Sequence, residues 1–199
     1  MPKFQKKTGE IVTSNKLRIA GFLAMTSAIL SIPVLLLSYH FNENDTLGYA
    51  LFLTFMQIIA LCFFTYLNLF LKKFLNLRFS FHDADNYIDF LITINFFLCF
   101  AGIAEIYLST FAEPLEQFSL LLLGSFGIGQ LLFGIKLFQL PDTLQGLLKP
   151  FCFFVILTGI LVTTIFLSPF AALTGAIADV MLGTIFFQAC ETCEGQDTC

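Results

Sequence analysis

Six long apolar runs divide this chain of 199 residues, and they constrain its fold more than any other feature. A helix needs about 20 apolar residues to cross the hydrocarbon core of a bilayer. Backbone polar groups find no partners in lipid, so apolar segments of this length are expected to be helical. We therefore predict an all-α integral membrane protein with six transmembrane helices, over residues 17–39, 48–71, 88–111, 117–140, 150–168 and 170–189.

The composition excludes a water-soluble domain. Hydrophobic residues make up 57% of the chain and charged residues 12%, whereas soluble domains average about 45–50% and about 25%. Too few polar groups remain to cover the surface of a soluble core of this size. The net charge of −4 does not suggest a nucleic-acid partner. The lipid bilayer is the first predicted partner.

The last two apolar runs form a hairpin that is interrupted at Pro169. Proline lacks a backbone donor and ends or kinks a helix. Two full crossings are the preferred interpretation, which makes a bundle over residues 17–189. Five crossings plus a re-entrant segment are the alternative.

The basic residues predict the orientation. With helices that alternate in direction, all ten lie on one side of the membrane, and the opposite loops carry only acidic charges. The positive-inside rule places the basic side in the cytoplasm. We predict a bacterial inner-membrane protein with both termini cytoplasmic, a basic tail over 1–16 and an acidic, cysteine-rich tail over 190–199. The basic residues are Lys3, Lys6, Lys7, Lys16, Arg18, Lys72, Lys73, Arg78, Lys136 and Lys149.

The polar segment 71–90 separates the second and third runs. Apolar and polar residues alternate from Leu75 to His82, which is a strand-like period of two. An unpaired strand is unfavourable at a membrane surface, so we predict an extended interfacial connector. This segment is also the candidate cytoplasmic interaction site, with Arg78, His82, Asp83 and Asp85 as its central residues.

The acidic residues at the end of this segment have two interpretations. Asp83 and Asp85 precede the third apolar run, where carboxylates accept hydrogen bonds from free amides and favour the positive end of the helix dipole. Helix capping is therefore expected. The alternative is a metal or proton site formed with His82 and Asp89, although the spacing matches no specific metal motif.

Two acidic residues, Glu105 and Asp179, lie inside the apolar runs. Such residues are costly in a membrane and suggest a functional site. Both belong to small or polar stripes at helical spacing, which predict inward faces of a bundle. We expect an uncharged Asp179 that shares a hydrogen bond with Gln130 or Gln57. The alternative is a polar path that carries protons or a cation. Other stripe members are Ser27, Ser31, Asn68, Asn95, Cys99, Gly102, Gly127, Gly134, Gly175 and Gly183.

No motif for catalysis or cofactor binding is present in the sequence. It has no HExxH, no P-loop and no GxGxxG after a strand. Cys190 and Cys193 form a CxxC in the predicted tail, without the thioredoxin-like context that this motif requires. We expect an unstructured tail with reduced thiols, no metal, no cofactor and no enzymatic activity.

These features lead to two functional hypotheses. The first is a non-enzymatic membrane anchor, sensor or immunity-type subunit that acts through a protein partner, or a second copy of itself, on the cytoplasmic face. The absence of a soluble domain and the small-residue helix faces favour it. The rival is a small ion channel or proton-coupled transporter that uses Glu105 and Asp179.

Overall fold

A computed structural model describes residues 14–40, 47–140 and 146–194, and this part of the chain contains helices and no strands. Five of its helices are long and apolar enough to cross a membrane, and α5 is the shorter exception. A single 3₁₀ turn, Ser109–Phe111, joins α3 to α4. The helices are α1 (Ser14–His40), α2 (Leu47–Phe79), α3 (Asp85–Tyr107), α4 (Ala112–Phe138), α5 (Leu148–Thr163) and α6 (Ser168–Glu194).

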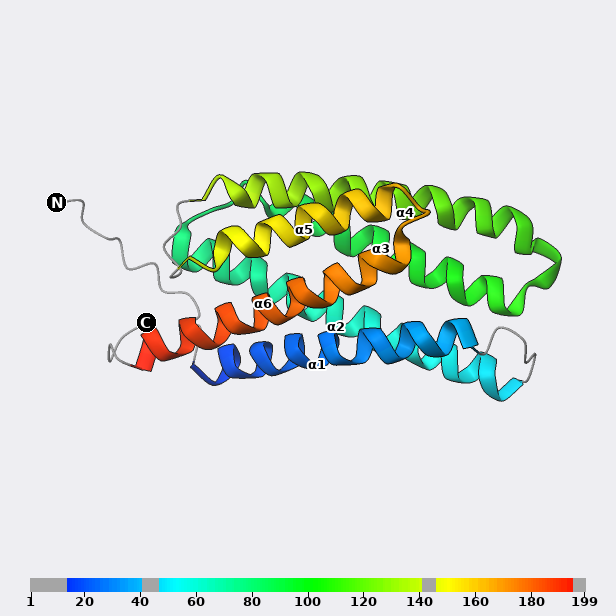
Figure 1. The fold of residues 1–199 in the computed structure, drawn as a ribbon, viewed down its shortest axis with the longest axis horizontal. Helices are drawn as coiled ribbons and strands as arrows, with labels where there is room; N and C mark the ends of the chain where they lie inside the picture. Colours follow the sequence, from blue (N-terminus) through cyan, green and yellow to red (C-terminus); the bar gives the residue numbers. More distant parts are fainter. Residues whose placement is uncertain (1–13, 41–46, 141–145, 195–199) are drawn as a thin grey trace.

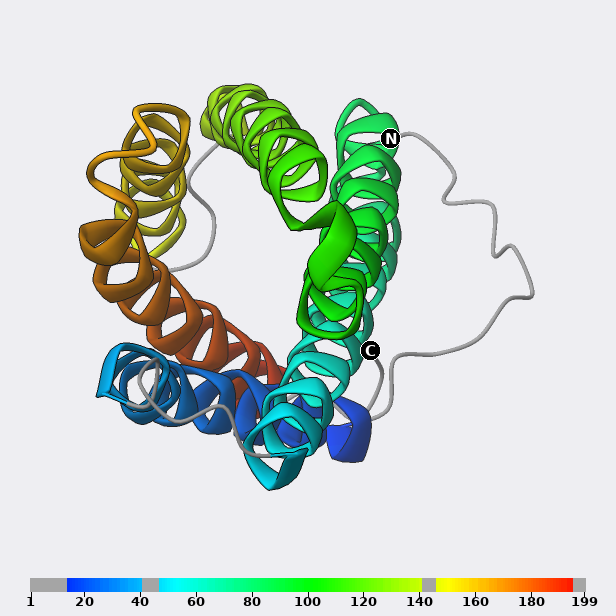
Figure 2. The ribbon, with the colours of Figure 1, turned by 90° about the vertical axis from the view of Figure 1, so that its right-hand side faces the viewer.

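The six helices form a closed ring. Viewed along the bundle, each helix lies beside its neighbours in the sequence, and α6 returns to pack on α1 (Figure 2). Consecutive helices run in opposite directions, so the start of α1 and the end of α6 lie together (Figure 1). We call this the termini end of the bundle, and the end with the α3–α4 connection the opposite end.

Glycines set the two closest helix crossings. A Cβ atom on Gly159 of α5 would lie 2.7 Å from the backbone nitrogen of Leu131 and 2.8 Å from the carbonyl oxygen of Gly127 in α4. On α6, a Cβ on Gly183 would lie 3.0 Å from the carbonyl oxygen of Gly21 in α1. Small residues allow helix backbones to approach each other this closely, which explains the stripes seen in the sequence.

The main core fills the termini half of the bundle. Its largest fully buried side chains include Leu17, Leu75, Leu137 and Phe186, drawn from four different helices. The opposite half contains only a small buried cluster among the described residues, made of Ile94, Ala101 and Leu122. The ring is therefore packed at one end and much looser at the other.

The predicted extended connector is wrong for most of its length. Helix α2 continues to Phe79, and the chain leaves it at Ser80, which has a φ of 51°. Leu71 and Leu75 are buried on one helical face, whereas Leu77 is 50% exposed. The period of two was coincidental, because the i, i+4 spacing of these leucines matches a helix equally well.

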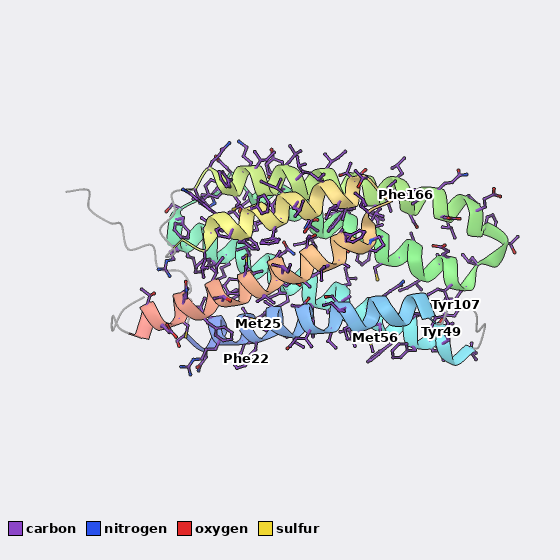
Figure 3. The ribbon with its side chains drawn as sticks, viewed as in Figure 1. Phe22, Met25, Tyr49, Met56, Tyr107 and Phe166 are labelled. Carbon is purple, nitrogen blue, oxygen red and sulfur yellow. The ribbon has the colours of Figure 1, made fainter. Side chains whose placement is uncertain are left out.

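Helix α5 is shorter than the predicted run 150–168. Its 16 residues end at Thr163, which corresponds to about 24 Å of rise, less than the hydrocarbon core of about 30 Å. The turn to α6 lies well inside the ends of α3 and α4 along the bundle (Figure 1). At this turn, Phe166 points away from the bundle and is 96% exposed (Figure 3).

The C-terminal tail begins later than predicted. Helix α6 extends to Glu194, so residues 190–194 are helical. Cys190 is 2% exposed, and its sulfur lies 3.0 Å from the Ser14 hydroxyl oxygen of α1. This end of α6 is held by packing against α1. The remaining tail residues, 195–199, lie outside the described part of the chain, as does the N-terminal tail up to residue 13.

Candidate functional site

A central cavity of about 90 Å³ lies inside the ring, and all six helices contribute to its lining. Four of the lining side chains are polar and the rest are apolar. The cavity carries one carboxylate, and no lysine, arginine or histidine lines it. Its polar members are Ser27 of α1, Asn68 of α2, Gln130 of α4 and Asp179 of α6.

Asp179 is held by Ser27 rather than by either predicted glutamine. The Ser27 hydroxyl donates a hydrogen bond of 2.8 Å to Asp179 Oδ2. Among the described residues it is the only hydrogen-bond partner of this carboxylate. The close α1–α6 crossing at Gly21 and Gly183 accounts for the pairing, because two helices in such close contact also bring their short polar side chains together.

The amide side chains around Asp179 leave oxygen atoms without partners. Gln130 Oε1 is buried and has no hydrogen-bond partner among the described residues. Asn68 uses its Nδ2 to donate to the Phe64 carbonyl oxygen at 2.9 Å, so its own oxygen remains an acceptor. The cavity lining therefore carries unsatisfied acceptors, together with the amide N–H groups of Gln130, which also have no hydrogen bond among the described residues.

A larger pocket of about 410 Å³ lies between α1, α2 and α3, on the side of the cavity toward the opposite end. Ser27 and Phe64 line both spaces, so the two adjoin. Gln57 lines this outer pocket and packs against Gly102, where a Cβ atom would lie 3.0 Å from Gln57 Nε2. Gln57 Oε1 is another buried acceptor without a partner in the described structure. Further polar lining comes from Ser31, Asn95 and Cys99.

Three aromatic rings pack together on the termini-end side of the cavity, next to its lining residues Leu71 and Leu182 along α2 and α6. The ring of Phe186 on α6 lies edge-on to Phe70 and Phe74 of α2, with centroid distances of 5.1 Å and 5.8 Å. All three side chains are buried. Edge-to-face pairs of this kind are favourable beyond their area of burial. They bridge two helices that are not neighbours in the ring.

The structure separates the two intramembrane acids. Asp179 faces the central cavity, whereas Glu105 is exposed on α3 and lines neither the cavity nor the outer pocket. Glu105 is therefore not part of the polar space around Asp179. Helical spacing grouped Glu105 with Asn95 and Cys99, which do line the outer pocket, but it did not show how far along α3 the lining extends.

Ser27 and Asn68 are the two site residues that sequence reasoning did not select as candidates. Both belonged to polar stripes, but neutral residues are common at helix interfaces and carry little signal alone. The signal that could have found them is their position along the two helices, which predicts the depth of each side chain in the bundle. Ser27 lies 13 residues into α1 and Asn68 lies 11 residues before the end of α2, a similar depth for two helices that run in opposite directions.

At the termini end, the acidic residues of segment 71–90 make side-chain bonds instead of capping α3. Ala84 occupies the N-cap position, and no side chain caps the helix. Asp85 accepts hydrogen bonds of 3.0 Å from Asn76 Nδ2 and lies 3.3 Å from His82 Nδ1. The capping prediction is wrong for Asp85, although its position in the first turn still favours the helix dipole.

The alternative metal site is not assembled in the described chain. Asp89 pairs with Lys72 at 2.7 Å, and no group of three potential ligands forms among the described residues. His82 and Asp83 instead line an open cleft of about 740 Å³ between α3 and α4, with Lys136 on its other wall. Arg78 lies with its guanidinium carbon 5.8 Å from the centre of the Phe74 ring.

Comparison of the chain with protein-family models, with curated proteins and with solved structures finds no match. Its function is therefore argued from the central cavity and its surroundings.

Proposed function

We propose that this chain is a non-enzymatic multi-pass membrane protein that moves a small solute across the bilayer, as a small channel or a proton-coupled transporter. The observation that supports this best is the Asp179–Ser27 pair in a cavity lined by all six helices. A carboxyl group at this depth is costly and is retained where it serves a function. The channel or transporter, which was the second of the two sequence-based hypotheses, thus becomes the leading one. In this form it uses Asp179 but not Glu105.

Access to the cavity favours a transporter that alternates between states over a permanently open pore. The outer pocket adjoins the cavity on one side, and Phe70, Phe74 and Phe186 pack together on the other. Transporter sites commonly lie near the middle of the membrane, between the parts that move. Movement of α2 relative to α6 would separate these aromatic rings and connect the cavity with the termini end.

We propose further that the termini end faces the cytoplasm of a bacterial inner membrane. The basic residues in the described chain lie at the termini-end boundaries of their helices, as with Arg18, Lys72, Arg78, Lys136 and Lys149. The positive-inside rule supports this orientation. In that case the outer pocket opens toward the periplasmic side. Attachment of a membrane-impermeant thiol reagent to Cys199 from outside intact cells would contradict it.

The test of transport is flux in liposomes that contain the purified protein. Proton and cation gradients are imposed in turn and read with a pH-sensitive or ion-sensitive dye. We expect flux for the native protein, a loss of at least tenfold for Asp179→Asn, and full flux for Glu105→Gln. Glu105 is a matched control, because it is the same type of intramembrane acid outside the cavity. Equal flux in Asp179→Asn and the native protein would overturn the proposal.

A second candidate is a subunit that binds a protein partner at its cytoplasmic face. The open cleft lined by His82, Asp83 and Lys136 favours it, because mixed charges around a concave surface suit a polar partner. A photo-crosslinking residue at Asn86, which lines this cleft, should capture such a partner in native membranes. The same residue placed at exposed Phe153 of α5 is the control, and equal capture at both positions contradicts this candidate.

A further inference from the structure

We propose that the central cavity binds one monovalent inorganic cation, held by oxygen atoms of Asp179, Gln130, Asn68 and Ser27. The role of this ion in transport rests on the proposed function, whereas its binding does not. The argument uses the charge of the cavity, the orientation of its polar groups and its size.

The charge of the cavity matches a single positive charge. Asp179 is the one titratable side chain in its lining, and no basic side chain faces it from any of the six helices. An ionised carboxylate in such a place is expensive unless a positive charge accompanies it. Sites for divalent cations usually recruit several carboxylates and six or more oxygen ligands. One carboxylate with neutral oxygens therefore favours a monovalent cation.

The neutral side chains around this space carry oxygen atoms that could turn toward an ion. Gln130 Oε1 is buried and unpaired within the described structure, which costs free energy unless a ligand or water satisfies it. The Asn68 amide nitrogen is engaged by the Phe64 carbonyl, so its oxygen is free to coordinate. Ser27 donates its proton to Asp179 and keeps oxygen lone pairs. Oxygen atoms are the ligands that hard cations prefer, and the amide N–H groups of Gln130, which have no partner in the described structure, are free to bind water beside the ion.

The size of the cavity excludes larger solutes. Its volume of about 90 Å³ compares with about 300–1,000 Å³ for pockets that hold drug-sized ligands. One water molecule needs about 10–15 Å³ by this measure, so the cavity has room for an ion with a few waters. The adjoining outer pocket of about 410 Å³ offers a route by which a hydrated ion reaches Ser27 and then Asp179.

The experiment measures thermal unfolding of the purified full-length protein in detergent. The melting temperature is compared in NaCl, KCl and choline chloride of equal ionic strength, and at several pH values in choline chloride. A ligand that binds only the folded state raises stability by mass action. At one hundred times the Kd, we expect a rise of about 5–10 °C with Na⁺ or K⁺ relative to choline. Melting that rises as the pH falls but is equal in the three chlorides would contradict the site, because protonation of a buried carboxylate gives that result without a bound ion.

Three variants of the site and one control variant outside it make the measurement decisive. Gln130→Leu removes one proposed ligand without changing the charge and should weaken cation binding at least fivefold. Asp179→Asn should abolish the ion-dependent shift, and Glu105→Gln should keep it. If Asp179→Asn does not fold, Gln130→Leu and Ser27→Ala still test the site. An unchanged cation dependence in the site variants would overturn the proposal, as would equal melting of the native protein in NaCl, KCl and choline chloride.

Binding and transport can fail separately. A cation-dependent melting shift without flux in liposomes would leave the binding site intact and contradict the transport function. Flux that depends on Asp179, without any cation effect on melting, would support transport and contradict this site.

Discussion

The two halves of the bundle differ in how tightly the interior between the six helices is packed. In the termini half, large side chains from α1, α2, α4 and α6 meet and are fully buried, with Phe186 at the centre. In the opposite half, the interior between α1, α2 and α3 is a pocket of about 410 Å³. Asp179 lies where one half gives way to the other. One ring of helices can therefore contain both a stable core and an accessible polar space, because one segment of each helix packs in the core and another segment lines the open half.

The first prediction concerns the two cysteines that mark these halves. Cys99 lines the outer pocket, and Cys152 is 0% exposed in the packed half. In variants that keep one cysteine each, with the others changed to serine, a small charged thiol reagent should modify Cys99 and leave Cys152 unmodified. Mass spectrometry of the intact protein reads the result. Modification of Cys152 at the same rate would show that the termini half is also open.

The second prediction tests the packing of the three aromatic rings. Phe186→Ala removes a ring that is 0% exposed and contacts two others. The free energy of unfolding should fall by about 3–5 kcal/mol, from lost burial and the cavity left behind. Titration with a denaturing detergent measures it. Phe100→Ala is the matched control, because Phe100 is 67% exposed and its truncation should change the unfolding free energy by less than about 1 kcal/mol.

The third prediction tests a close crossing that supports the ring. Gly159→Ala places a methyl group against the α4 backbone, so α4 and α5 must move apart. We expect a loss of about 1–3 kcal/mol in unfolding free energy, which is typical of overpacking. Gly124→Ala on α4 adds the same methyl group where no atom lies within 4 Å. Equal stability of the two variants would mean that the α4–α5 contact is looser than described.

The smallest effect is expected at the surface of the termini end. Lys72 and Asp89 form an ion pair of 2.7 Å, with 55% of the Asp89 side chain exposed. Exposed pairs contribute about 0–1 kcal/mol, so Lys72→Gln should reduce the unfolding free energy within that range. Lys149→Gln removes an exposed charge of the same type and serves as control. A loss above about 2 kcal/mol for Lys72→Gln alone would show that this pair helps to hold α2 on α3.

Sequence reasoning recovered most of the helices but not all of their limits. The long apolar runs of α1, α3 and α4 could be recognised because lipid-facing and core-facing positions are both apolar. Segment 75–79 was misread, since Leu75 and Leu77 satisfy a period of two as well as a helix. The ends of α5 and α6 were also shifted. The apolar run continues through the turn at Ile165 and Phe166, so hydropathy alone does not mark where α5 stops.

The candidate site, like the helices, could be predicted only in part from the sequence. Asp179, Gln130 and Gln57 could be selected from the sequence, because polar residues in apolar runs are rare and lie at helical spacing. The residues that they meet in the folded bundle could not be selected from the sequence. Ser27 pairs with Asp179 across 152 positions of the chain, and Gln130 joins the same cavity from another helix. Glu105 had the same sequence signal as Asp179 but lies outside the cavity.

The sequence by itself determined that this chain is helical, with apolar runs long enough to cross a membrane, because apolar length and helical spacing are local properties. It predicted six such helices, whereas the described part of the chain has five that are long and apolar enough. Only the tertiary structure decided which polar residues meet. The order of helices around the ring and the glycine crossings bring Asp179 to Ser27 and leave Glu105 outside. Those outcomes depend on packing between distant segments, where a residue's neighbours are set by the rotation and tilt of each helix rather than by its own sequence context.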